Sequence, residues 1–299
     1  MRREFANLKS IPLTKNFNTS GDTLSSEVFF LFEKRYTNTM IETPHNVEEI
    51  SALLKLASFE ELPALLERYG EDPRKQVQRS VVSAQKRYDK ESSERVRVEG
   101  MYELMHKLSP HGIALGIDEV GRGSVAGPLT VCALALPDTP IIYGLNDSKK
   151  LSASKREELA QEIAKHALYI GIAHIEPEKI DAAGMGASLH VAMQRAIKDA
   201  GVEPDYVLLD GNPMHIHDKE INIINGDAKL ACIAAASIVA KVTRDRIMDL
   251  ADAEYPGYGF SHCKGYASAE HIKAIQELGL SDYHRKSFCT GFLPQEKLF

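Results

Sequence analysis

The pattern of apolar and polar residues divides the chain into a helical first part and an alternating second part. In the first part, apolar side chains recur at helical spacing over 47–56 and again over 62–69. A charged stretch with scattered apolar positions follows over 74–108. The pattern therefore predicts two short helices and one long, solvated helix within a region that spans 45–110.

From Ile113 onward, short apolar runs of strand length alternate with amphipathic stretches of helical length. The expected strands are 113–118, 129–136, 168–175, 205–211 and 221–224. The expected helices are 154–166, 185–200, 228–255 and 268–278, the first of them beginning at a capping-box spacing between Ser154 and Glu157. Strands separated by helices in this way predict one α/β domain with a mixed sheet over 111–299.

Residues 1–44 show no sustained periodicity and are rich in Ser, Thr and Asn. We expect a poorly ordered extension, with Met40 as a candidate alternative start. The apolar run at 28–32 is too short for the core of a signal peptide. Two interpretations of 45–110 stay open, an auxiliary binding module and a helical prefix that docks on the main domain.

Composition narrows the protein class but does not reveal a partner. No apolar run is long enough to span a membrane, and the four cysteines are scattered, at Cys132, Cys232, Cys263 and Cys289. This pattern indicates reduced thiols and a cytoplasmic location, and argues against structural zinc. Residues 1–100 hold 16 basic and 16 acidic side chains, so the net charge of −6 belongs to the remainder. A nucleic-acid partner would need local basic patches or bound cations.

Four acids are the candidates for chemistry. Asp118 and Glu119 close an apolar strand and precede the Gly-Arg-Gly turn 121–123, Asp210 closes another strand, and Asp227 lies in a turn before a helix. Sites in α/β sheets gather at strand ends, so the acids are expected to converge. Carboxylates alone favour Mg²⁺ or Mn²⁺, and two such ions roughly 3.5–4 Å apart hydrolyse phosphodiesters. Each acid alone could instead be a surface residue, and Asp227 could be a helix cap.

Seven motifs then occur along the chain: Gly116-Ile-Asp-Glu-Val-Gly-Arg-Gly123, Ala126-Gly-Pro128, Asp147-Ser-Lys-Lys-Leu-Ser152, Leu209-Asp-Gly211, Gly226-Asp227, Ala235-Ala-Ser-Ile-Val-Ala-Lys241 and His284-Arg-Lys-Ser-Phe288. With these motifs in this order, the chain from about Ile113 to Phe288 resembles bacterial ribonuclease HII. The helical prefix resembles an extension found in some members from Gram-positive bacteria. The resemblance implies an α/β fold, with an RNase H-like mixed β-sheet flanked by helices and an N-terminal helical extension.

The resemblance also implies an activity and a metal. The expected enzyme is an endonuclease that cleaves RNA in RNA–DNA hybrids and at a single ribonucleotide embedded in duplex DNA, leaving 3′-hydroxyl and 5′-phosphate ends. It would use Mn²⁺ or Mg²⁺. Metal binding and catalysis are assigned by resemblance to Asp118, Glu119, Asp210 and Asp227.

Substrate contacts follow from the same resemblance. Gly121, Arg122 and Gly123, with Tyr266, are expected to read the ribose 2′-hydroxyl, because amides of a glycine turn can read it without reading the base. Tyr266 offers a ring for stacking, although a half-buried structural tyrosine is the alternative. The first candidates for phosphate contacts, which carry little sequence information, are Lys149, Lys264 and Arg285; ranked below them are Lys150, Lys241, Arg244, Arg246 and Lys286. The loop histidines are expected to be exposed and not to bind metal, namely His215, His217 and His284.

The chain departs from the family pattern in two places, at Cys263 and Ala267 around Tyr266 and at Cys289-Thr-Gly-Phe292 after Phe288, and both leave the acids unchanged. The alternatives are a ribonuclease HIII-like hybrid nuclease and a non-catalytic hybrid-binding protein. The Gly-Arg-Gly turn favours the HII type. Four acids argue against binding alone, because a protein that only binds a polyanion would present Lys or Arg.

Overall fold

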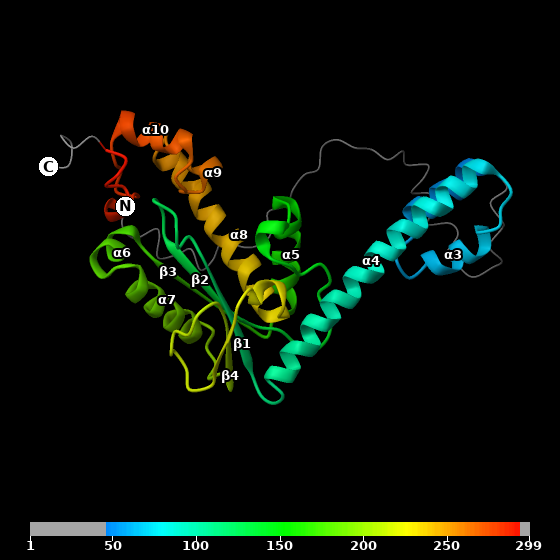
Figure 1. Ribbon diagram of the computed structural model, residues 1–299, viewed down its shortest axis with the longest axis horizontal. Coiled ribbons are helices and arrows are strands. Elements are labelled where there is room, and N and C mark those ends of the chain that lie inside the picture. The colour runs from blue at the N-terminus through cyan, green and yellow to red at the C-terminus, as the bar shows by residue number, and fades with distance from the viewer. Residues whose placement is uncertain (1–45, 294–299) are drawn as a thin grey trace. The chain divides into compact units, whose positions relative to one another are not determined.

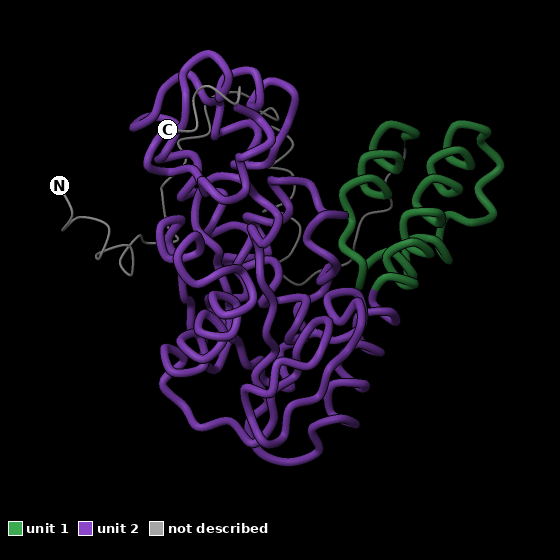
Figure 2. The backbone as a smooth tube through the Cα atoms, turned by 60° about the vertical axis from the view of Figure 1, so that its left-hand side comes forward, with its two compact units in different colours: residues 1–94 green, residues 95–299 purple. Residues whose placement is uncertain are grey.

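The computed structural model describes residues 46–293, and the extension expected at 1–44 lies outside this range. Contacts between Cα atoms group the chain into two compact units that divide between Glu94 and Arg95 (Figure 2). The division falls inside a long helix, whereas the sequence pattern places a boundary at residue 110. Each unit has its own buried core.

The first unit consists of α2 (Val47–Leu56), α3 (Leu62–Tyr69) and the first part of α4 (Lys75–Leu108). The three helices predicted here are confirmed. Their buried core contains Ile50, Leu54, Leu62, Leu66, Val77 and Ala84. The Arg87 guanidinium donates to the carbonyl oxygens of Leu54 and Ala57, at 2.9 and 3.0 Å, and so satisfies the end of α2.

The second unit is built on a five-stranded mixed sheet in the order β3-β2-β1-β4-β5. Its strands are β1 (Ala114–Val120), β2 (Leu129–Ala135), β3 (Tyr169–Ile175), β4 (Tyr206–Asp210) and β5 (Glu220–Ile223). Strand β2 pairs antiparallel with both β1 and β3, while β4 pairs parallel with both β1 and β5. The predicted α/β class and mixed sheet are confirmed.

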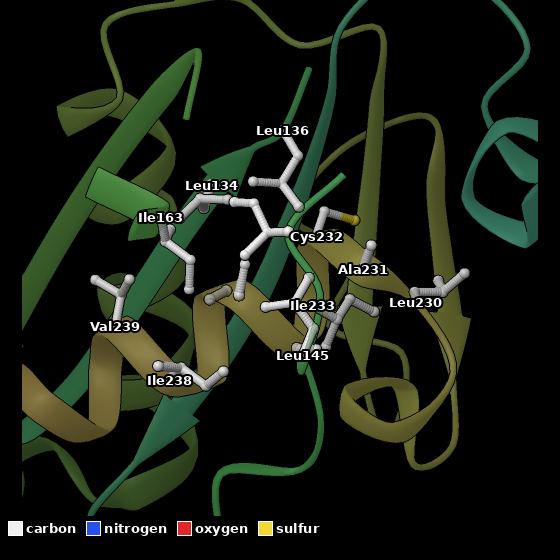
Figure 3. Packing of buried hydrophobic residues seen from close by; sticks show 14 of the residues in the cluster. Leu134, Leu136, Leu145, Ile163, Leu230, Ala231, Cys232, Ile233, Ile238 and Val239 are labelled. Carbon is white, nitrogen blue, oxygen red and sulfur yellow. The ribbon is translucent and has the colours of Figure 1, made fainter. Parts of the chain in front are cut away.

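Helices cover both faces of this sheet (Figure 1). The helices of this unit are α5 (Ala153–His166), α6 (Pro177–Ala183), α7 (Met185–Asp199), α8 (Ala231–Glu254), α9 (Phe260–Cys263) and α10 (Ala269–Leu278). One face packs on α5 and α8 through a core that includes Leu134, Ile163 and Ile238 (Figure 3). Side chains from the last turns of α4 join this core, which explains why the second unit begins inside that helix. The other face packs on α7.

The contact between β1 and α8 is unusually close and fixes the start of the site. A Cβ atom on Gly116 would lie 2.4 Å from the carbonyl carbon of Cys232 and 2.6 Å from the Ile233 nitrogen. Glycine therefore lets the helix backbone rest on the strand two residues before Asp118. This contact fixes the distance between the helix and the first candidate acid.

Some local predictions need correction. Helix α5 begins after Ser152, whose hydroxyl accepts the Lys155 N–H at 3.2 Å, so the predicted capping box at Ser154 is wrong by two residues. Helix α6, with Pro177 in its first turn, was not predicted. The four cysteines carry no disulfide, as expected. Within 46–293, no helix combines the length and apolar character that crossing a bilayer requires.

Candidate active site

Three carboxylates meet at the end of the parallel strand pair. Ile117 on β1 lies opposite Leu209 on β4, so Asp118 and Asp210 follow at neighbouring positions. Asp227 reaches the same place from a 3-10 turn, Gly226–Ala228, just after β5. One oxygen from each of these three side chains lies within 4.8 Å of the other two. The expected convergence of strand-end acids is thus visible for three of the four.

The turn that carries Asp227 is fixed by its neighbours. The Gly226 N–H donates to Asp210 Oδ1 at 2.6 Å. A Cβ atom on Gly226 would lie 2.7 Å from Ile233 Cδ1, so a larger residue would push the turn away from α8. Asp227 does not cap that helix, because Leu230 occupies the N-cap position and α8 has no side-chain cap. The alternative of a simple helix cap for Asp227 is therefore wrong.

Glu119 stands beside this cluster and is not one of its three members. Its backbone N–H donates to Asp118 Oδ1 at 2.7 Å, and its carboxylate lies 3.6 Å from Arg122 Nη1. Successive side chains of a strand point to opposite faces, which separates these adjacent acids. Glu119 is still close enough for the charge of Asp210 to contribute to raising its pKa, after the larger effect of burial.

The electrostatics of the cluster favour a cation. Burial, and then the charges of Glu119 and Asp210, raise the pKa of Asp118 well above its usual range, although a hydrogen bond from Ser237 opposes this. Burial, and then the charges of Asp147 and Asp210, raise the pKa of Asp227 to about 6. Converging carboxylates in a poorly hydrated site repel one another unless a positive ion neutralises them. An all-oxygen donor set fits a hard divalent cation such as Mg²⁺ or Mn²⁺.

A glycine turn lies next to the acids and contacts the tyrosine segment. We define the glycine turn as residues 121–128 and the tyrosine segment as residues 264–266. Gly121 has φ +85°, and a Cβ atom there would lie 2.3 Å from Arg244 Nε. The Val125 and Ala126 N–H groups donate to the Gly265 carbonyl at 2.8 and 3.1 Å. The residues that follow the predicted Gly121–Gly123 turn are therefore in direct contact with Gly265, the neighbour of Tyr266, and Tyr266 is 39% exposed.

Comparison with known proteins now identifies the family. The family model for ribonuclease HII matches residues 115–291, and the model for the ribonuclease HII N-terminal domain matches residues 46–108. The chain belongs to the ribonuclease HII family. It is therefore a hydrolase of the ribonuclease H type, an endonuclease that acts on RNA–DNA hybrids. Enzymes of this type depend on divalent metal ions, in keeping with the acidic cluster.

Individual relatives agree with this assignment. The chain is 43% identical over 244 residues to ribonuclease HII of Lachnoclostridium phytofermentans, covering 81% of this chain and 96% of that protein. It is 40% identical over 220 residues to ribonuclease HII of Listeria monocytogenes, covering 73% and 84%. The crystal structure of ribonuclease H2 from Pyrococcus horikoshii superposes with a TM-score of 0.53 at 24% identity, covering 60% and 96%. This last likeness confirms the RNase H-like fold.

Residues beyond the predicted set also shape the ribonuclease HII site. Ser237 on α8 lies close enough to Asp118 to lower the pKa of that carboxyl, and its hydroxyl oxygen lies 3.0 Å from that of Ser148. Asp147 lies close enough to share a hydrogen bond with Asp227. Both loop residues fall in the Asp147–Ser152 motif, and Ser237 falls in the motif 235–241. These motifs signalled the family, but nothing in their residue pattern indicates that they contact the acids.

The predicted phosphate contacts occupy different environments. The Lys149 side chain is exposed and lowers the pKa of Asp227, which places it near the acids. Lys264 forms an ion pair with Asp249. Arg285 is fully buried beneath the glycine turn and donates to the carbonyl oxygens of Arg122 and Gly127. Its placement favours a supporting role over direct contact with phosphate.

The expectation that His284 is exposed is wrong. Its side chain is buried, and its Nδ1 accepts the Ser281 N–H at 3.0 Å. Its Nε2 lies 3.1 Å from Nε2 of His271, whose Nδ1 lies 2.8 Å from the Tyr266 carbonyl oxygen. The aromatic ring of Tyr258 packs against His284. Because His271 contacts the Tyr266 carbonyl, the histidine pair supports the tyrosine segment. The expectation holds for His215, which is exposed.

Proposed function

We propose that this enzyme hydrolyses the phosphodiester bond on the 5′ side of a ribonucleotide, leaving 3′-hydroxyl and 5′-phosphate ends. Its substrates would be RNA–DNA hybrids and duplex DNA that contains a single ribonucleotide. The observation that carries the proposal is the convergence of Asp118, Asp210 and Asp227 within 4.8 Å. The glycine turn that contacts the tyrosine segment supports the second substrate.

The acids would hold Mg²⁺ or Mn²⁺, with Glu119 joining Asp118, Asp210 and Asp227. Two such ions, when bound, supply an activated water and stabilise the leaving oxygen of a phosphodiester. Neighbouring groups in the protein would orient these carboxylates before a metal ion binds. The Gly226 N–H orients the Asp210 carboxylate, and Ser237 orients the Asp118 carboxylate. Burial, and then the neighbouring carboxylates, raise the pKa values of Asp118 and Asp227, so a bound cation would offset the cost of ionising these acids.

The 2′-hydroxyl would be read by the glycine turn. Backbone amides of Gly121, Arg122 and Gly123 can bond a ribose without regard to the base. The exposed ring of Tyr266 would stack on the sugar or base at the junction. Lys149 and Lys264 would contact phosphates, with Lys264 exchanging Asp249 for the substrate. Arg285 would act through the Arg122 carbonyl that it holds.

The proposal includes the organisation and location of the chain. Residues 111–299 would form the catalytic region, preceded by the helical region 45–110, whose last turns pack within the catalytic unit. A cytoplasmic location agrees with four cysteines that carry no disulfide.

A cleavage assay tests the function. The full chain is incubated with a DNA duplex that carries one ribonucleotide and with a continuous RNA–DNA hybrid, in Mg²⁺ and then in Mn²⁺. We expect a nick on the 5′ side of the ribonucleotide that disappears in Asp210→Asn. Asp138→Asn is the matched control, because its carboxylate is 85% exposed and pairs with His106, outside the acidic cluster. Cleavage of the hybrid alone would favour the HIII-like alternative, and hybrid binding without cleavage would refute the nuclease proposal.

A further inference from the structure

Arg244 is a cation buried in the second unit without a carboxylate partner. It projects from α8, is 0% exposed, and forms no ion pair with any carboxylate in residues 46–293. Removing a guanidinium from water is costly unless its N–H groups find acceptors. Four bonds satisfy it, and every acceptor is a backbone carbonyl or a hydroxyl. The guanidinium is therefore held by the geometry of its hydrogen bonds and not by an ion pair.

These four bonds join the glycine turn to the tyrosine segment. Within the turn, Nε donates to the Pro128 carbonyl at 2.9 Å, and Nη2 donates to the Ser124 hydroxyl at 2.8 Å and to the Ala126 carbonyl at 3.0 Å. Toward the tyrosine segment, Nη1 donates to the Lys264 carbonyl at 2.8 Å. One planar group thus bridges both segments.

The bridge extends to the residues that would touch the ribose. The Ser124 hydroxyl, which accepts from Arg244, donates to the Gly121 carbonyl at 2.9 Å. The guanidinium carbon also lies 5.6 Å from the centre of the Tyr266 ring, within cation–π range. Space beneath Gly121 is filled by the Arg244 side chain itself. Among the side chains that support these two segments, Arg244 contacts both the Ser124–Gly121 part of the turn and the Tyr266 ring.

We infer that Arg244 is a positioning residue that sets the orientation of the glycine turn relative to Tyr266, and through it the preference for a ribonucleotide–DNA junction. The inference rests on the proposed roles of the turn and of Tyr266. A rigid fork of five donors can hold several acceptors in one plane, whereas the single ammonium of lysine cannot. The geometry of the guanidinium, more than its charge, is what the junction requires.

The test compares two arginine-to-lysine substitutions. Arg244→Lys keeps the charge and removes the fork. Arg195→Lys makes the same chemical change at an exposed side chain on α7, outside the residues proposed to bind substrate. Ser124→Ala removes one acceptor of Arg244 and is the milder variant should Arg244→Lys fail to fold. For each protein, kcat and KM are measured on the single-ribonucleotide duplex and on the continuous hybrid, and Mn²⁺ affinity is measured by calorimetry.

We expect Arg244→Lys to lose about tenfold to a hundredfold in kcat/KM on the single-ribonucleotide duplex. The loss on the continuous hybrid is smaller, so the ratio of the two substrates changes, while Mn²⁺ affinity stays at the wild-type value. Ser124→Ala shifts the ratio in the same direction by less, and Arg195→Lys leaves it unchanged.

Three results would overturn the inference. Equal losses on both substrates would reduce Arg244 to general support of the fold. A wild-type substrate ratio in Arg244→Lys, or in Ser124→Ala if that is the variant that folds, would show that the fork is not needed. A wild-type enzyme that does not cleave the single-ribonucleotide duplex would refute the proposed function itself, and this result is recognisable because it requires no variant.

Discussion

Replacing Asp227 with asparagine should stabilise the metal-free protein while it abolishes metal-dependent cleavage. Asp227 is buried, with Asp118 and Asp210 within 4.8 Å. Its pKa is raised from 3.8 to about 6, first by burial and then by the charges of Asp147 and Asp210. Ionised Asp227 thus opposes folding, and an uncharged amide of the same shape removes this opposition. The amide can also donate to the Asp147 carboxylate.

The size of the effect follows from linkage between protonation and folding. A difference of about two pKa units corresponds to about 3 kcal/mol at a pH above both values. Salt and water at the mouth of the site screen the interaction, so we expect about 1–2 kcal/mol in practice. For a domain of this size, that gain raises the melting temperature by about 2–8 °C. The protein would then gain stability by losing function.

The stability difference between Asp227→Asn and the wild type should depend on pH. Because the folded-state pKa is raised, the folded protein binds the proton more tightly than the unfolded chain does. The penalty is full above about pH 6 and disappears as the pH falls toward 3.8. Asp227→Asn should therefore exceed the wild type in stability at pH 8 and match it near pH 4.

Urea unfolding in EDTA, at both pH values, measures this difference, and the exposed Asp138→Asn variant is the control. A parallel titration with Mn²⁺ should stabilise the wild type more than the variant, because a ligand that binds only the folded state shifts the equilibrium. A variant that is no more stable than the wild type at pH 8 would refute the reasoning, as would a gain that is the same at both pH values.

Three further predictions follow from the packing. Gly116→Ala should lower the free energy of unfolding by about 1–3 kcal/mol, because its Cβ would press on the Cys232 backbone. It should also slow cleavage more than Gly171→Ala, which crowds α7 on the opposite face of the sheet. Urea unfolding and initial cleavage rates compare the two variants. Burial holds the pKa of His284 near 4. The free energy of unfolding of the wild type should therefore fall by up to about 3 kcal/mol as the pH drops from 6.5 to 4. Urea unfolding should show a smaller fall in His284→Gln. Leu54→Ala should cost about 2–5 kcal/mol in the first unit only, seen as faster amide exchange in α2 and α3 with unchanged exchange in the sheet.

Sequence reasoning identified Asp118, Glu119 and Asp210 because strand ends are local signals. Asp118 and Asp210 each close an apolar run, and a parallel pairing places such ends side by side. Asp227 carries no such signal, since a Gly-Asp turn before a helix is common as a cap. The bond from Gly226 to Asp210 joins residues 16 positions apart, and it is this bond that brings the turn to the site. Without the family resemblance, Asp227 could not have been separated from an ordinary cap.

The burial of certain polar side chains could not be predicted from the local sequence. His284 and Arg285 occupy a polar motif near the end of the chain, where exposure is the usual outcome. Both are buried because their partners come from elsewhere: Arg285 bonds the carbonyl of Gly127, 158 residues earlier, and His284 meets His271. Helix α6 was missed for a different reason, because it has only 7 residues and shows too little periodicity.

Helix α8 contacts both the acidic cluster and the glycine turn. Ser237 reaches Asp118 from it, and Arg244, seven residues or about two turns later, reaches the glycine turn from the same side. Gly116 fixes how closely this helix approaches β1. A shift of α8 is therefore expected to weaken metal binding and junction preference together, as in Gly116→Ala. Arg244→Lys leaves the helix in place and should change junction preference alone, so the two variants separate the position of the helix from the bonds that its arginine makes.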